Sequence, residues 1–145
     1  MSLFIKNARV VAGGGEPALA GASVRIDGDR ISALGTQLVP EAGDDIIDAG
    51  GRVLLPGLFD MHVHLGPWDG GLHLAAGVTT VRDMGAVNAV LAGYVAQIEG
   101  GRAIGPRVVP AGFIEGASEY KSSGGFTATS LDDVRSSACA FSAIR

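Results

Sequence analysis

The sequence has 145 residues, of which 47% are hydrophobic and 18% charged, and its formal net charge is −4. This length corresponds to one domain or to part of a larger one, and the apolar fraction excludes a disordered chain. No cluster of Lys or Arg is present, so we expect no binding to nucleic acid or to an anionic membrane surface. Neither a signal peptide nor an apolar run of about 18 residues is seen. Cys139 is the single cysteine, so no intrachain disulfide can form. We expect a cytoplasmic protein with Cys139 as a small buried side chain.

Residues 1–57 have the pattern of β structure. Short β-branched segments at Phe4 to Val11 and Ala22 to Leu34 are separated by glycine-rich turns, and residues 46–47 and 53–55 add further strands. Asp27-Gly28 lies between two strand-like runs and predicts a two-residue hairpin turn. With that turn, Arg25 would face Arg30 on the polar side of a half-buried antiparallel sheet.

From residue 58 the pattern changes to alternating strands and helices. Strands are predicted at Leu58 to His64, Val78 to Met84 and Arg107 to Ile114, with helices near 71–76 and from Val87 to Glu99. A last helix is predicted to begin at Ser130, because Ser130 and Asp133 have capping-box spacing. This alternation indicates an α/β fold with a parallel sheet.

The strand predicted at residues 58–65 carries polar groups on one side. Phe59, Met61, Val63 and Leu65 would share one face, and Leu58, Asp60, His62 and His64 the other. Because His62 and His64 are two residues apart, both imidazoles point the same way, and both can bind one metal ion at about 2.0–2.1 Å. If the strand is buried on both faces, a bound cation would offset the cost of burying these groups. The alternative is a solvated polar face on an edge strand.

Four segments resemble the amidohydrolase superfamily. The sequence from Leu55 to His64 resembles the start of that family's first barrel strand, and residues 47–53 resemble the segment before it. Residues 77–85 and 105–116 are similar to the second and third barrel strands, especially of the imidazolonepropionase-like and prolidase-like branch.

The resemblance implies a β-sandwich joined to a (β/α)8 TIM barrel. Residues 1–57 would be the N-terminal part of the sandwich, and residues 58–145 the first three β/α units of an incomplete barrel. His62 and His64 would bind a divalent metal, expected to be Zn2+, with one or two ions in the complete enzyme. That enzyme would be a homo-oligomer that hydrolyses the C–N bond of a small-molecule amide or peptide-like substrate through metal-activated water.

The chain departs from this family in length. A complete barrel takes about 250 residues, whereas this sequence has room for about three β/α units after residue 57. His73 is expected to be a helix or loop residue, and Lys121 lies at the wrong place in the order to serve as the family's bridging lysine. We therefore assign no catalytic residue and expect the chain to be inactive alone. The alternatives are a non-catalytic metal-binding or oligomerising module, and one half of a split barrel.

Four further residues are candidates for the site. Asp60 could orient one of the histidines or make a simple buried hydrogen bond. Asp83 could line the site or cap the start of a helix. Glu115 and Tyr120 follow the third strand, where barrel enzymes place substrate contacts.

Overall fold

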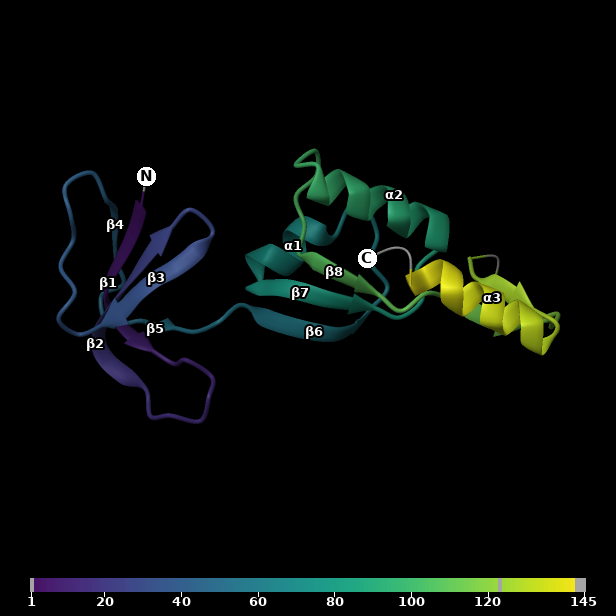
Figure 1. Ribbon diagram of the computed structural model, residues 1–145, viewed down its shortest axis with the longest axis horizontal. Helices are drawn as coiled ribbons and strands as arrows, with labels where there is room; N and C mark the ends of the chain where they lie inside the picture. The colour runs from purple at the N-terminus through teal and green to yellow at the C-terminus, as the bar shows by residue number, and fades with distance from the viewer. Residues whose placement is uncertain (1, 123, 143–145) are drawn as a thin grey trace. The chain divides into compact units, whose positions relative to one another are not determined.

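The computed structural model describes residues 2–122 and 124–142, with side chains up to residue 138 (Figure 1). It therefore does not test the prediction for the side chain of Cys139. The chain divides into two compact units, Met1–Pro56 and Gly57–Arg145. The predicted α/β class is confirmed, because strands and helices are both present and alternate in the second unit. Within the described residues, no helix is long and apolar enough to cross a membrane.

The first unit contains a five-stranded mixed sheet. Its strands are β1 (Ser2–Val10), β2 (Leu19–Asp27), β3 (Arg30–Gly35), β4 (Asp45–Asp48) and β5 (Val53–Leu54). The order is β3-β2-β1-β4, and β5 also pairs with β1. The first two pairings are antiparallel, whereas β4 and β5 run parallel to β1. Small and β-branched side chains form its core: Ala8, Val10, Ala22 and Val24.

The predicted hairpin exists, but its register is shifted. Asp27 pairs with Arg30, so Gly28 rather than Asp27 is the first residue of the two-residue turn, and its φ of 62° suits glycine. A bulge at Ser32 then places Arg25 opposite Ala33. The predicted juxtaposition of Arg25 and Arg30 is therefore wrong.

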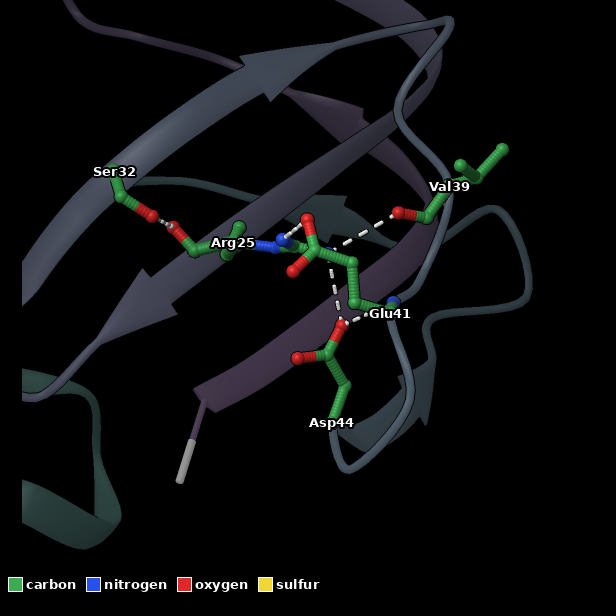
Figure 2. A network of polar contacts seen from close by, with 5 residues as sticks. All are labelled: Arg25, Ser32, Val39, Glu41 and Asp44. Atoms are coloured by element: carbon green, nitrogen blue, oxygen red, sulfur yellow. Dashed lines mark hydrogen bonds and ion pairs between the residues drawn. The ribbon is translucent and has the colours of Figure 1, made fainter.

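Arg25 instead ties the segment before β4 to the sheet (Figure 2). Its guanidinium pairs with Glu41 and donates to Asp44 Oδ2 at 2.9 Å and to the carbonyl of Val39 at 3.2 Å. It also lies 5.6 Å from the centre of the Phe4 ring. The hydrogen bond to Glu41, with the charge of Asp44, raises the pKa of Arg25 above its ordinary value. Residues 39–44 are thus anchored by one side chain.

A three-stranded parallel sheet forms the centre of the second unit. Its order is β6-β7-β8, with β6 at Leu58–Val63, β7 at Val78–Asp83 and β8 at Arg107–Pro110. Helix α1 (Gly70–Ala75) connects the first two strands, and α2 (Asn88–Glu99) connects the second and third. The buried hydrophobic cluster of this unit is formed by two residues of α2 and by residues of the strands and the loop after β6: Leu91, Tyr94, Val63, Leu65 and Val81.

The third predicted strand is shorter than expected. It ends at Pro110, which has no N–H to donate to a ladder, and Gly112 follows with a φ of 75°. Ile114 belongs to a separate strand, β9 (Ile114–Gly116), which pairs in parallel with β10 (Phe126–Ala128).

The last helix, α3 (Leu131–Ser142), begins with the predicted capping box. Asp133 N donates to Ser130 Oγ at 3.1 Å, and Ser130 N donates to Asp133 Oδ2 at 2.9 Å. Hydrogen bonds from the main chain and hydroxyl of Thr129, and then from Ser130, lower the pKa of Asp133.

Candidate functional site

The two histidines lie side by side at the carboxyl end of β6. His62 is the fifth residue of the strand, and His64 directly follows its end at Val63. The centres of the two imidazole rings are 5.5 Å apart, and the ring planes meet at 67°. The spacing of two residues has therefore brought both rings to one side of the strand, because alternate side chains share a face.

The prediction that strand β6 is buried on both faces is wrong in the described residues. His62 and His64 are exposed, and Asp60 is half-buried. On the opposite face Val63 and Leu65 are buried, but Phe59 and Met61 are 67% and 58% exposed. The reason is that the packed core reaches only the end of the strand, where α2 lies. The argument that a cation must offset a buried polar face therefore does not apply to this chain.

The ring geometry nevertheless fits a shared metal ion. An ion about 2.0–2.1 Å from one nitrogen of each ring lies about 3 Å from each ring centre, so centres 5.5 Å apart can meet one ion. A third donor is lacking among the described side chains, residues 2–122 and 124–138, where no three His, Cys, Asp or Glu residues form a group that could hold a metal. The described residues thus offer two candidate donors, whereas a catalytic zinc normally has three protein ligands.

The carboxylate of Asp60 contacts the main chain of His62. Its Oδ1 accepts the backbone N–H of His62 at 3.1 Å, so it restrains the strand rather than an imidazole ring.

Asp83, at the end of β7, is 1% exposed and joins two loops. Its Oδ2 accepts the N–H of Leu65 at 2.6 Å, and its Oδ1 accepts those of Gly85 at 3.0 Å and Ala86 at 2.8 Å. Leu65 directly follows His64, so this carboxylate fixes the chain beside the second histidine. The alternative that Asp83 caps a helix start is not seen, because α2 has Val87 as its N-cap without a side-chain hydrogen bond, and Gly85 and Ala86 precede that residue.

The two candidates after the third strand are placed differently from each other. Glu115 lies in β9, and its carboxylate accepts the N–H and the hydroxyl of Ser122 at 2.9 and 3.1 Å. Tyr120 is 88% exposed in the following loop. The structure therefore gives Glu115 a role in holding this loop.

Two residues of this region, Asn88 and Phe113, were not predicted from the sequence. Asn88 makes paired hydrogen bonds to the main chain of Phe113, accepting its N–H at 3.0 Å and donating to its carbonyl at 3.1 Å. Phe113 and His64 both lie against Gly85. No sequence signal predicts that Phe113 lies against Gly85, because Gly85 is in the turn after β7 and Phe113 is in the loop after β8.

The remaining candidates lie elsewhere. His73 is in α1, as expected, and Lys121 is exposed with its Nζ 3.2 Å from Thr127 Oγ1.

An α/β chain with a histidine pair at the end of its first parallel strand defines a recognisable class, and comparison with known proteins identifies it. The family model described as "Amidohydrolase family" matches residues 45–117. The chain belongs to this family, as the sequence resemblance predicted.

Individual relatives in sequence agree with this assignment, and a solved structure shows the same fold. An imidazolonepropionase of Arthrobacter sp. (strain FB24) is 53% identical over 47 residues, which are 32% of this chain and 12% of that enzyme. A dihydroorotase of Lactobacillus johnsonii is 47% identical over 64 residues, 44% of this chain and 14% of that enzyme. A crystal structure of a Xaa-Pro dipeptidase with methionine bound in its active site superposes with a TM-score of 0.84 at 21% identity, covering 99% of this chain and 45% of that one. Each match therefore spans less than half the length of the related protein.

Proposed function

We propose that this chain is part of a metal-dependent hydrolase that cleaves C–N bonds in small amide or peptide-like molecules. The observation that carries the proposal is the side-by-side placement of two imidazoles at the end of β6, inside the segment that matches the family model. His62 and His64 would hold a divalent cation, with Zn2+ as the first candidate. When bound, such a cation supplies Lewis acidity and an activated water for attack on a carbonyl carbon.

The architecture proposed for the complete enzyme is a β-sandwich joined to a (β/α)8 barrel. Residues 1–57 would be part of the sandwich, and residues 58–145 would supply the first three β/α units. With two ligands and no assigned general base, the 145-residue chain would be inactive alone. Its own residues would bind the metal weakly, hold His62 through Asp60, and fix the chain beside His64 through Asp83.

Metal titration of the purified chain tests this proposal. Calorimetry with ZnCl2 should detect one weak site, and His62→Ala or His64→Ala should each lower its affinity at least about tenfold, because one ligand is lost. His73→Ala is the matched control and should bind like the wild type, since His73 lies in α1. Equal zinc binding by the wild type and both ligand variants would contradict the proposal.

A second candidate function is an oligomerising module, and one observation favours it. In the part of the chain that the structure describes, β6 and β8 each have a sheet neighbour on one side only, and two large apolar residues of β6, Phe59 and Met61, are exposed. Such edges pair readily with other chains. Light scattering distinguishes the candidates: a stable oligomer without bound zinc favours the module, and a 145-residue monomer that binds zinc favours the hydrolase fragment.

A further inference from the structure

The turn after β7 passes unusually close to the ring of His64. An ideal Cβ placed on Gly85 would lie 3.2 Å from His64 Cε1 and 3.3 Å from Nδ1. Both distances are shorter than ordinary van der Waals contact, so any side chain at this position would displace the ring by a few tenths of an ångström. The φ of Gly85 is not in the left-handed region, so glycine is needed here for space and not for backbone conformation.

The ring of Phe113 lies on the same glycine. The ideal Cβ of Gly85 would be 3.6 Å from Phe113 Cδ2, so the rings of His64 and Phe113 both lie against Gly85. On its other edge the Phe113 ring is close to Gly125, whose ideal Cβ would lie 2.9 Å from Cδ1. The Phe113 ring therefore occupies a slot between two glycines.

The main chain around this slot is held by side-chain hydrogen bonds. Asn88 binds both the N–H and the carbonyl of Phe113, and Phe126 N donates to the same carbonyl at 2.7 Å. The carboxylate of Asp83 binds the N–H of Gly85 and that of Leu65. The backbone on both sides of the His64 ring is thus tied to one buried group.

We propose that Gly85 and Phe113 form a seat for the His64 imidazole, and that they act as positioning residues for the metal ligand. This inference rests on the proposed function for its purpose, whereas the contacts that form the seat are made by this chain's own residues. By comparison, the contacts described above for His62 are the hydrogen bond from its main-chain N–H to Asp60 and the edge contact of its ring with that of His64. His64 is accordingly the more rigid ligand of the pair, and the seat preorganises it before a cation arrives.

The first test is made without metal. Imidazole resonances of His64 are recorded by NMR in the wild-type chain, in Gly85→Ala and in Gly116→Ala. Gly116 is the matched control, because its added Cβ would have no neighbour within 4 Å and its φ is also ordinary. We expect Gly85→Ala to shift the His64 ring signals and Gly116→Ala to leave them unchanged. Phe113→Leu should also shift them, because an aromatic ring near the imidazole is removed.

The second test measures metal affinity. Gly85→Ala should lower Zn2+ affinity about tenfold, the loss typical when a group that orients a ligand is removed. Phe113→Leu should lower it as well, because the second positioning residue of the seat is lost. Backbone amide spectra show whether each variant is folded. If Gly85→Ala is not folded, Phe113→Leu alone provides the test.

The outcomes separate the two proposals. If Gly85→Ala and Phe113→Leu shift the ring signals but no variant or wild-type chain binds zinc, the seat stands and the metal function fails. If zinc binds through His62 and His64 while Gly85→Ala behaves like Gly116→Ala in both measurements, the seat is overturned and the metal function stands.

Discussion

Replacing Asp83 with alanine removes a buried carboxylate that accepts three backbone N–H groups, at 2.6, 3.0 and 2.8 Å. An unsatisfied buried donor costs about 1–3 kcal/mol. Leu65 is buried and takes the full cost, whereas Gly85 and Ala86 are half-buried and can partly bond to water. We therefore expect Asp83→Ala to lower the free energy of unfolding by about 3–5 kcal/mol, a large part of the 5–15 kcal/mol typical of a domain.

Urea unfolding followed by circular dichroism measures this loss, and hydrogen exchange locates it. The amides of Leu65, Gly85 and Ala86 should exchange faster in Asp83→Ala, while those of the first unit should not change. Asp132→Ala is the control: Asp132 forms an exposed pair with Arg135 at 3.1 Å, and its loss should cost less than about 1 kcal/mol. A cost below 1 kcal/mol for Asp83→Ala, with unchanged exchange at the three amides, would refute the reasoning.

Three further predictions concern the rest of the chain. Gly70→Ala should lower the free energy of unfolding by about 1–3 kcal/mol, because its Cβ would meet the backbone near residue 104 and the Tyr94 hydroxyl. Gly71→Ala, with no neighbour within 4 Å, should be neutral or stabilising by up to about 1 kcal/mol in the same urea titrations. The lowered pKa of Asp133 predicts that its contribution to stability is complete above its ordinary value of 3.8 and is lost as the pH falls through the lower folded-state value. NMR titration of α3 should show this loss, and Asp133→Asn should abolish its pH dependence. Arg25→Met should lower the urea midpoint of the first unit, because the carboxylate of Asp44, only 5% exposed, would lose its ion-pair partner; an unchanged midpoint would contradict this.

The local patterns of the sequence were sufficient for most of the elements and for the side-by-side placement of the histidines, but they did not predict β9 and β10. The spacing of two residues places His62 and His64 together in any strand, and the capping box at Ser130 is a contact between neighbours in sequence. The hairpin register was predicted wrongly because the two-residue turn is Gly28-Asp29 and not Asp27-Gly28, and a bulge at Ser32 then adds a residue that alternation cannot reveal.

Contacts between distant segments could not be predicted. The bonds from Asp83 to Leu65 and the meeting of Gly85 with Phe113 depend on how three loops pack at the carboxyl ends of the strands. The exposure of Phe59 and Met61 likewise follows from what covers β6, which no single-strand pattern contains.

The carboxylate of Asp83 also sets an order of events during synthesis. The residue after His64 obtains its partner only when β7 has docked and the turn at Gly85 and Ala86 has formed. A nascent chain that has left the ribosome only as far as β6 therefore carries both histidines without the frame that orients the second. The contacts that hold the chain around His64 thus come from later segments, at Gly85 and Ala86 and then at Phe113.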